Sequence, residues 1–482
     1  MLREQALFAP RMSPNIPDKL NLKRTLLISL GFLSVLIALS YYNFMVPLLL
    51  YDMIPEDFKF FFIGQNILVG GIMTIDNILA VALQPYFAAL SDRTESKFGR
   101  RMPFIIVGVL SCAFFFAVAP WIRLLVGFII VLFFFNIFMS FYRSTTLALM
   151  ADYTPDKVRP TASGIQQLIA NTGASVAFLL PGLIGFLAPN LDITTRRSVG
   201  FPVISVGMLV CLVILYFTIK ETPTGDGFIK ISKRPIALDP VSFELKGSQE
   251  GEDAGEDKSM WATFHSLFRP ERRATLFFLF TIFSWWTAFG AIEAFFSSFA
   301  VNYLGLTDGE AGILVLIYPV SMTLSAVFVG MFGQRIGRKK SLFVGTYGLI
   351  ILIGLNIAVA IPTKNIAMIG VLLALIGVFW MMIIVNTFPV VWAYAPEGEI
   401  GAFTGIYYTF NQGAAIASPI LMGLVFDFLG GGMGNDKFLF LYPFMLGCVL
   451  VALLFLFLVR GEEKDLSEEE IEELRSQFEE ID

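Results

Sequence analysis

Long apolar stretches alternate with short polar connections along this chain. A transmembrane α-helix needs about 20 consecutive, mostly apolar residues to cross the hydrocarbon core of a bilayer. Twelve stretches reach that length: the first six lie near 25–50, 64–90, 103–120, 124–150, 161–187 and 200–219, and the second six near 274–300, 310–332, 341–361, 366–392, 402–429 and 438–459. The pattern predicts an all-α membrane protein with twelve transmembrane helices in two six-helix bundles.

The polar segments complete the predicted domain organisation. In chain order we expect a cytoplasmic N-terminal segment, a six-helix bundle, a cytoplasmic central loop, a second six-helix bundle and an acidic cytoplasmic tail, at 1–24, 25–219, 220–273, 274–459 and 460–482. In the central loop, 247–258 is polar and typical of a disordered linker. Trp261, Phe264 and Phe268 then recur at helical spacing beside arginines, which indicates an amphipathic helix on the inner leaflet. The capping box of Ser467 and Glu470 predicts a short helix in the tail.

Composition agrees with a membrane location. Hydrophobic residues make up 56% of the 482 residues and charged residues only 15%. The net charge of −5 arises from acids that are concentrated in the central loop and the tail. We expect the partners to be a lipid bilayer and a small-molecule substrate, and we expect no binding of nucleic acid. Cys112, Cys211 and Cys448 each fall in an apolar run, which favours neither a disulfide framework nor a metal site. The first 24 residues lack the apolar region of a cleaved signal peptide.

The basic residues predict the orientation. Lys and Arg are retained on the cytoplasmic side of membrane proteins. With the N-terminus inside, cytoplasmic segments other than the central loop hold 18 of them, and the external loops hold six: Lys59, Arg123, Arg196, Arg197, Lys364 and Lys437. We therefore expect a multi-pass protein of the plasma membrane with both termini in the cytoplasm.

Two sequence features recur in both halves of the chain. The basic loop around Gly99 is repeated, shortened, at 333–340. Tyr153-Thr154-Pro155 is followed nine residues after its proline by Gly164, and Tyr394-Ala395-Pro396 is followed at the same spacing by Gly405, an offset of 241 residues. Two homologous halves of this kind are typical of a two-bundle transporter, in which the substrate binds midway between the halves and their rocking alternates access.

The basic loop around Gly99 and its flanking residues resemble a known family. Gln84-Pro85, Ser91-Asp92-Arg93, Phe98-Gly99-Arg100-Arg101 and Pro103-Phe104-Ile105 resemble the major facilitator superfamily and, within it, the plant sucrose–proton symporters and their animal and bacterial sugar-transporter relatives. The broader match is to the glycoside–pentoside–hexuronide:cation symporters. Arg143 followed by Leu147 to Asp152 also resembles the arginine-to-aspartate segment of that group's fourth helix.

The resemblance implies an inner gate at the two related loops. Its residues would be Asp92, Arg93, Gly99, Arg100, Arg101 and Asp152 in the first half, and Arg335, Gly337 and Arg338 in the second. Gln334 stands where the second copy would carry its acid, so we expect a stronger gate in the first half.

The chain departs from the cation sites of its relatives. Plant symporters carry an acid about three turns before the helix-4 arginine, where this chain has Leu132 to Phe135. Melibiose-type relatives hold sodium with two helix-2 aspartates one turn apart, whereas Asp76 is followed one turn later by Ala80. Any coupling to a cation must therefore use other residues of this chain.

Three ionisable residues lie well inside predicted spans: Asp76, Arg143 and Glu293. Such a group costs about 3 kcal/mol or more unless it faces protein or a water-filled cavity. One interpretation is a fixed ion pair that only orients the bundle. The other is that Asp76 or Glu293 pairs with Arg143 in one state and takes a proton in another, with Asp76 favoured as the cation-linked group and Glu293 the alternative.

Polar side chains in both halves suit a hydrophilic neutral substrate, because amides and carboxylates hydrogen-bond ring hydroxyls and aromatic rings pack against a sugar's apolar face. Singly, each is better explained by packing or hydrogen bonding between helices. The predicted substrate-binding residues are Asn43, Asn77, Asn136, Arg143, Gln167, Asn171, Trp286, Glu293, Asn386, Asn411 and Gln412.

The favoured function is a secondary transporter that imports a glycoside, such as a sucrose- or maltose-like disaccharide, with protons. Sodium coupling, export, another polar solute and a transporter-like sensor are the alternatives. We expect no enzymatic activity, because the chain has no nucleophile elbow, phosphate loop or metal-ligand motif. No cofactor is expected besides the coupling ion, proton or sodium, and the protein is expected to act as a monomer.

Overall fold

Twelve membrane-length helices make up most of the structure, which is a computed structural model. It describes residues 20–94, 96–154, 158–219, 267, 269, 272–394 and 400–459. Within these residues, twelve helices are long and apolar enough to cross a membrane. The prediction of an all-α protein with twelve spans is therefore confirmed.

The first six spans are formed by α1 (Leu22–Met53), α2 (Gln65–Asp92), α3 (Met102–Val118), α4 (Leu125–Asp152), α5 (Arg159–Leu187) and α6 (Ile193–Thr218). The second six are formed by α8 (Arg273–Ser298), α9 (Asp308–Ile336), α10 (Arg338–Leu355), α11 (Ile366–Ala393), α12 (Ile400–Leu429) and α13 (Leu441–Leu458). A short antiparallel hairpin of β1 (Lys59–Phe60) and β2 (Ile63–Gly64) connects α1 to α2. Short segments of other helix types extend some of these helices, at Ala119–Trp121, Phe299–Tyr303, Asn356–Ala360 and Gly434–Phe440.

The start of α6 differs most from the sequence prediction. The apolar pattern placed this span at 200–219, but the helix begins at Ile193. Its N-cap is Asp192, whose side chain accepts a hydrogen bond from the backbone N–H of Thr195 (3.0 Å). The first turns therefore include Arg196 and Arg197, which a hydropathy pattern assigns to a loop.

The described residues fall into two compact units. The first comprises those within Met1–Pro235 and Glu293–Leu316, and the second those within Ile236–Ile292 and Ile317–Asp482. The last turns of α8 and the first turns of α9 thus belong with the first unit, whereas the remainder of both helices belongs with the second. The bundles at 25–219 and 274–459 stay a prediction.

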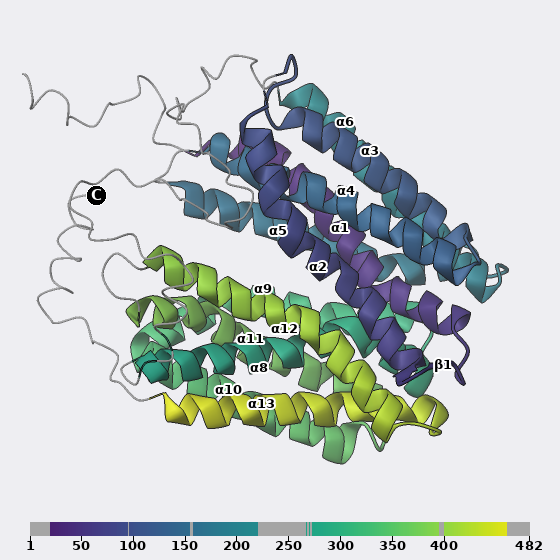
Figure 1. Cartoon of the computed structure of the whole chain (residues 1–482), viewed down its shortest axis with the longest axis vertical. Helices are drawn as coiled ribbons and strands as arrows, with labels where there is room; N and C mark the ends of the chain where they lie inside the picture. The colour runs from purple at the N-terminus through teal and green to yellow at the C-terminus, as the bar shows by residue number, and fades with distance from the viewer. Residues whose placement is uncertain are drawn as a thin grey trace, which may run out of the picture. The chain divides into compact units, whose positions relative to one another are not determined.

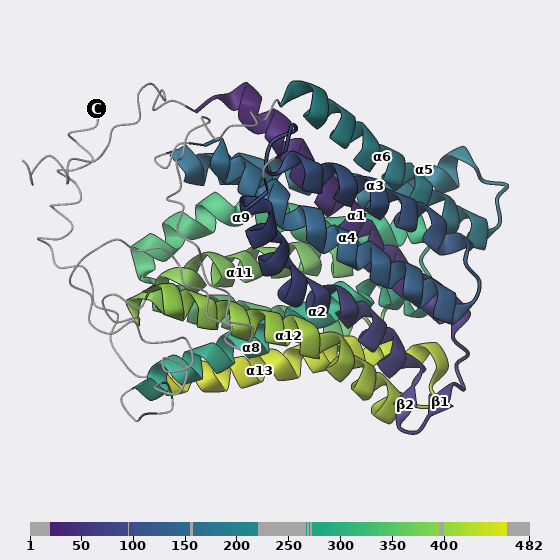
Figure 2. The ribbon, with the colours of Figure 1, turned by 45° about the horizontal axis from the view of Figure 1, so that its top comes forward.

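In the first unit, α1 packs mainly against α5 and α6, and α3 packs between α4 and α6 (Figures 1 and 2). Aromatic rings fill the space between these helices. Tyr41 meets Phe201 edge-on, with ring centroids 5.1 Å apart, and Phe116 stacks on Phe135 at 4.7 Å. In the second unit, α10 packs against α11 and α13.

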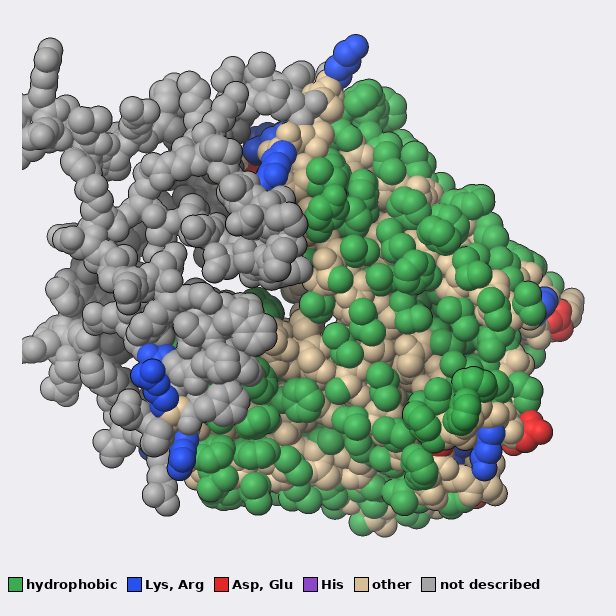
Figure 3. All heavy atoms as spheres, viewed as in Figure 1, with side chains coloured by type: hydrophobic (Ala, Val, Ile, Leu, Met, Phe, Trp, Pro, Cys, Tyr) green, Lys and Arg blue, Asp and Glu red, His purple; other side chains and the backbone are tan. Residues whose placement is uncertain are grey.

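Apolar side chains are spread over the visible surface of the helices. In the view of Figure 3, hydrophobic side chains lie along the helices, and the Lys, Arg, Asp and Glu side chains that can be seen gather near helix ends. This distribution suits a bilayer, in which helices satisfy their own backbone hydrogen bonds and present apolar side chains to lipid.

Two glycines in the related loops share an unusual backbone conformation. Gly99 has a φ of 93° and Gly337 a φ of 92°, in the left-handed region that residues with a Cβ rarely adopt. Gly99 lies just before α3, and Gly337 is the N-cap of α10. Each of the two related loops therefore makes its turn through a glycine with a positive φ.

Several sequence predictions lie outside the described residues. They concern the linker at 247–258, the aromatic residues Trp261, Phe264 and Phe268, the tail at 460–482, and the prolines of the second repeated motif, Pro155 and Pro396.

Candidate functional site

Three charged side chains of the first unit interact electrostatically with one another. Asp76 comes from α2, Arg143 from α4 and Glu293 from the last turns of α8. Asp76 interacts electrostatically with both Arg143 and Glu293, and Arg143 with Glu293. These residues, predicted separately from the sequence, therefore form one charged cluster.

Glu293 is held by a neighbouring amide. Asn43 of α1 donates a hydrogen bond from Nδ2 to Oε1 of Glu293 (2.9 Å). Glu293 is solvent-exposed although it lies within a membrane-length helix, and Asp76 and Arg143 are half-buried. A carboxylate at that depth needs either protein partners or water, and Glu293 has access to both.

Asp76 has a different environment. Its Oδ1 accepts a hydrogen bond from the backbone N–H of Asn77 (2.7 Å), the residue next to it. Within the described part of the chain, Arg143 forms no direct ion pair with Asp76 or Glu293, so their attraction acts over a longer distance.

Tyr42 and Asn136 extend the polar cluster. Asn136 of α4 donates from Nδ2 to the hydroxyl of Tyr42 (3.4 Å), and Tyr42 interacts electrostatically with Asp76. Asn136 Oδ1 is buried and has no hydrogen-bond partner among the described residues. Tyr42 adjoins the predicted binding residue Asn43 in the sequence, and α1 thus offers both side chains to a sugar.

The remaining predicted binding residues of the first unit lie on α5. Gln167 donates from Nε2 to Oδ1 of Asn171 (3.0 Å), one turn further along the helix. Gln167 is exposed, and Asn171 is half-buried. The two amides thus support each other on one face of α5, because residues four apart are neighbours on a helix.

In the second unit, Trp286 belongs to an aromatic cluster. It meets Trp380 edge-on at 5.9 Å, and Phe289 stacks on Trp380 at 5.3 Å with the ring planes 7° apart. Asn411 donates from Nδ2 to the hydroxyl of Tyr407 (3.5 Å).

The other predicted amides of the second unit differ in burial. Asn386 is buried, and its Nδ2 donates to the backbone carbonyl of Met382 (2.8 Å). A Cβ added at Gly333 would lie 2.4 Å from Asn386 Oδ1, so this amide packs where α9 and α11 approach closely. Gln412 is half-buried.

The predicted inner-gate residues of the first half are in contact. Arg101 pairs with Asp92 and with Asp152, the latter from Nε to Oδ2 at 2.9 Å, and Arg100 pairs with Asp152 at 3.3 Å. Arg101 is 4% exposed. Burial alone would lower the pKa of Arg101, but the hydrogen bonds and charges of Asp152 and Asp92 raise it above its ordinary value. We call Asp92, Arg100, Arg101 and Asp152 the inner-gate cluster.

The remaining gate positions are less constrained. Arg93, Arg335 and Arg338 are exposed, and no ion pair involves them among the residues that the structure describes. Among the described residues, the ion pairs of the two related loops thus lie in the first half of the chain. Asp92, which forms one of them, is the acid that the second copy of the loop lacks.

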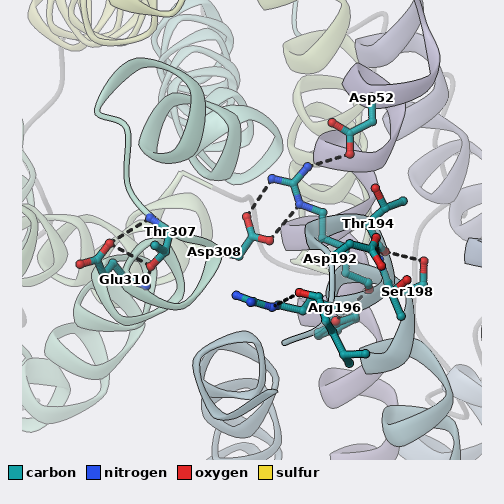
Figure 4. Close-up of polar contacts among 12 residues, drawn as sticks. Asp52, Asp192, Thr194, Arg196, Ser198, Thr307, Asp308 and Glu310 are labelled. Atoms are coloured by element: carbon teal, nitrogen blue, oxygen red, sulfur yellow. Dashed lines mark hydrogen bonds and ion pairs between the residues drawn. The ribbon is translucent and has the colours of Figure 1, made fainter. Parts of the chain in front are cut away.

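A second ion cluster joins α1, α6 and α9, and Figure 4 shows its surroundings. Arg197 donates from Nε and Nη2 to the two carboxylate oxygens of Asp308, both at 2.9 Å, and from Nη1 to Asp52 at 2.7 Å. Tyr41 donates a hydrogen bond to the backbone carbonyl of Arg197 (3.4 Å). We call Asp52, Arg197 and Asp308 the α6–α9 ion cluster.

Sequence reasoning missed this cluster. It placed Arg197 in an external loop and gave no role to Asp52 or Asp308. No signal in the sequence pointed to it, because the burial of Arg197 near the start of α6, which requires acidic partners, is visible only in the structure. Which acids they are depends on helix packing, since Asp308 lies 111 residues further along the chain.

The start of α9 is capped by side chains of its own first residues. Thr307 and Glu310 form a reciprocal capping box, in which Glu310 accepts from the backbone N–H of Thr307 at 2.9 Å and Thr307 Oγ1 accepts from that of Glu310 at 3.3 Å (Figure 4). The next turn packs directly on α5. A Cβ added at Gly312 would lie 2.0 Å from the carbonyl oxygen of Phe178.

Comparison with known proteins identifies the family and the fold of this chain. A family model described as Major Facilitator Superfamily matches residues 28–419 and 301–480. No curated protein matches the sequence. Solved structures do. A point mutant of the nucleoside transporter NupG is 14% identical, with 90% of this chain and 100% of that chain covered and a TM-score of 0.65.

Two further structures have a similar fold. A D-xylose–proton symporter is 16% identical, with 92% of this chain and 98% of that chain covered and a TM-score of 0.64. A bacterial homologue of the iron transporter ferroportin, in an inward-facing state, is 15% identical, with 92% of this chain and 100% of that chain covered and a TM-score of 0.63. At these identities the similarity establishes the fold and not the substrate.

Proposed function

This chain belongs to the major facilitator superfamily of secondary transporters, and we propose that it imports a glycoside, most simply a disaccharide, together with protons. The observation that carries the proposal is the charged cluster of Asp76, Arg143 and Glu293 inside membrane-length helices. We further propose that the protein acts as a monomer in the plasma membrane with both termini in the cytoplasm.

Charged residues at this depth favour a role in transport. An ionisable side chain inside a span costs about 3 kcal/mol or more unless it faces protein or water. A cluster with two acids and one base is also not a neutral ion pair, which a purely structural role would favour. A net negative site of this kind suits the uptake of one proton.

The surroundings of the two acids favour Asp76 as the residue that takes the proton. Glu293 accepts a hydrogen bond from Asn43 and interacts electrostatically with Arg143, so its carboxylate already has two partners. Asp76 is less exposed and lies near the negative charge of Glu293, which disfavours a second negative charge. Protonation of Asp76 removes that repulsion and leaves Arg143 matched to Glu293 alone.

The substrate would be bound close to this cluster. Asn136 has a buried amide oxygen without a partner among the described residues, and Tyr42 supplies an aromatic ring and a hydroxyl beside it. Gln167 and Asn171 on α5 present further amide groups. Amide and carboxylate groups beside an aromatic ring match the hydroxyls and the apolar face of a sugar. The motif resemblance to sugar symporters supports the same substrate class.

The two ion clusters suit alternating access. Because α2 crosses the membrane from Gln65 to Asp92, the inner-gate cluster lies at the opposite end of the spans from Asp52, where α1 ends. Breaking the inner-gate cluster would open one side, and breaking the α6–α9 ion cluster would open the other. Ion pairs suit this task because they form when that side of the transporter is closed, and their charged groups are solvated by water when it is open.

The proposal is tested by uptake into proteoliposomes that contain the purified full-length protein. The substrate panel comprises sucrose, maltose, trehalose, xylose and uridine, each with an inward proton gradient, with an inward sodium gradient and without a gradient. We expect a disaccharide to accumulate when the outside is acidic. Accumulation driven by sodium would replace the coupling ion, and uptake of uridine alone would replace the substrate class. Equal uptake with and without gradients would contradict coupled transport.

A further inference from the structure

Three consecutive phenylalanines form the tip of the connection between α1 and α2. Phe60, Phe61 and Phe62 are 61%, 87% and 71% exposed. They close the hairpin in which β1 pairs with β2, with Phe60 opposite Ile63 (Figure 2). This Phe60–Phe62 tip contains none of the residues assigned above to transport, so the proposed transport mechanism does not account for it.

The backbone at the tip is strained. Phe61 has a φ of 56°, in the left-handed region. At the first position of a two-residue hairpin turn, a positive φ favours glycine, because a side chain there crowds its own backbone. A bulky residue in this conformation is an outlier, and such strain is typical of residues retained for a function. The fold itself gains little from the Phe61 side chain, because most of it is exposed.

The base of the hairpin is fixed to the ends of both spans. Gln65 donates from Nε2 to the backbone carbonyl of Ile54 (2.6 Å), and Tyr51 donates to Oδ1 of Asn66 (2.8 Å). Gln65 and Asn66 are buried, at 3% and 4% exposure. Because α1 ends at Met53 and α2 begins at Gln65, the tip lies within a few residues of the membrane surface.

We propose that the Phe60–Phe62 tip is a membrane anchor that inserts into the interfacial region of the adjacent leaflet. The partner is the phospholipid surface itself. Aromatic side chains favour the boundary between headgroups and acyl chains, and insertion removes the exposed rings from water. The exposed Lys59 at the base can extend its ammonium group to lipid phosphates, while Glu56 and Asp57 stay on the aqueous side. Insertion would also fix the depth of α2, the helix that carries Asp76.

Spin labels test the position of the tip. Phe61→Cys and the control Glu56→Cys, each in a chain whose native cysteines are replaced by alanine, are labelled and reconstituted into phosphatidylcholine vesicles. Collisions with oxygen, which partitions into lipid, are compared with collisions with a water-soluble nickel chelate. We expect an oxygen-to-nickel ratio several-fold higher at position 61 than at position 56. Equal ratios would place the tip in water, and protection from both reagents would mean that protein covers it; either result overturns the proposal.

A second variant separates insertion from folding. Phe61→Gly removes the side chain and the backbone strain together, so the protein should unfold in detergent at the same or a higher temperature. A label at position 62 should nevertheless move towards water when Phe61→Gly is introduced. An unchanged depth at position 62 would show that Phe61 does not anchor the tip.

Discussion

Arg197 and Asp308 form a two-point ion pair between the first turns of α6 and α9. The guanidinium nitrogens Nε and Nη2 each lie 2.9 Å from one carboxylate oxygen of Asp308. The pair is largely shielded, because the side chains of Arg197 and Asp308 are 6% and 12% exposed. The geometry uses the planar fork of an arginine, which a lysine cannot reproduce.

Removing one partner of this pair should destabilise the protein. In Asp308→Asn, Arg197 keeps only the ion pair with Asp52, and we expect the free energy of unfolding to fall by about 3 kcal/mol. Thermal unfolding in detergent measures the loss. Asp57→Asn, a substitution of an exposed loop acid, is the matched control and should leave the unfolding temperature unchanged. Partial recovery in the exchanged pair Arg197→Asp with Asp308→Arg would confirm a direct interaction; unchanged stability in Asp308→Asn would contradict it.

The close approach of α9 to α5 predicts an effect of a single methyl group. A Cβ at Gly312 would lie 2.0 Å from the backbone oxygen of Phe178, so Gly312→Ala must move a helix and should lower the unfolding temperature. A Cβ at Gly354 in α10 would meet nothing within 4 Å. Gly354→Ala should therefore leave stability unchanged or raise it, because alanine is the better helix former. Equal behaviour of the two variants would refute the close contact.

Asp76→Asn should separate accumulation from exchange. The amide cannot take up a proton, so a gradient should no longer drive uptake, whereas exchange of internal for external sugar does not need the proton step. Proteoliposomes loaded with unlabelled sugar measure exchange, and empty proteoliposomes with an acidic outside measure accumulation. Unimpaired accumulation by Asp76→Asn would rule out this residue, and Glu293→Gln would then be examined in the same assays.

Asn43 and Glu293 should behave as a unit. Asn43→Ala removes the amide that donates to Glu293, and we expect about a tenfold slower uptake, equivalent to about 1.4 kcal/mol in the rate-limiting step. If Asn43 acts through Glu293, the double variant Asn43→Ala with Glu293→Gln should be no slower than the slower single variant. Independent, multiplicative losses would instead indicate that Asn43 contacts the sugar directly. Initial uptake rates over a range of sugar concentrations distinguish these outcomes.

The inner-gate cluster should affect rate without affecting specificity. Asp92→Asn removes one partner of Arg101 and should slow transport while leaving the rank order of sugars unchanged. Asp152→Asn should slow it further, because Asp152 pairs with both Arg100 and Arg101. Competition of unlabelled sugars against a labelled one measures the rank order. A changed order in Asp92→Asn would mean that the residue reaches the substrate.

Much of the fold could be predicted from the sequence because each span is specified locally. A bilayer requires about 20 apolar residues in one stretch, which can be read without knowing the neighbours of any helix. The same holds for Gly99 and Gly337, where a turn needs a positive φ. The start of α6 could not be predicted in this way, because its first turns hold two arginines and therefore do not resemble an apolar span.

The candidate site was predictable only in part. Asp76, Arg143 and Glu293 stood out because charge inside a span is rare and expensive. The amides were less informative: Asn386, for example, bonds to the backbone of Met382 and packs at Gly333, although its sequence position resembles that of a binding residue. An amide has the same appearance in a sequence whether it faces a sugar or a neighbouring helix.

By itself the sequence determined the number of spans, the positions of the charges inside the spans and the two related loops, because these follow from the chemistry of neighbouring residues in the chain. Only the tertiary structure decided which charges meet. Asn43 reaches Glu293 across 250 residues, and Arg197 reaches Asp52 across 145 and Asp308 across 111. Such partners are selected by how the helices pack, because hydrogen bonds and ion pairs act over a few ångströms whatever the separation along the chain.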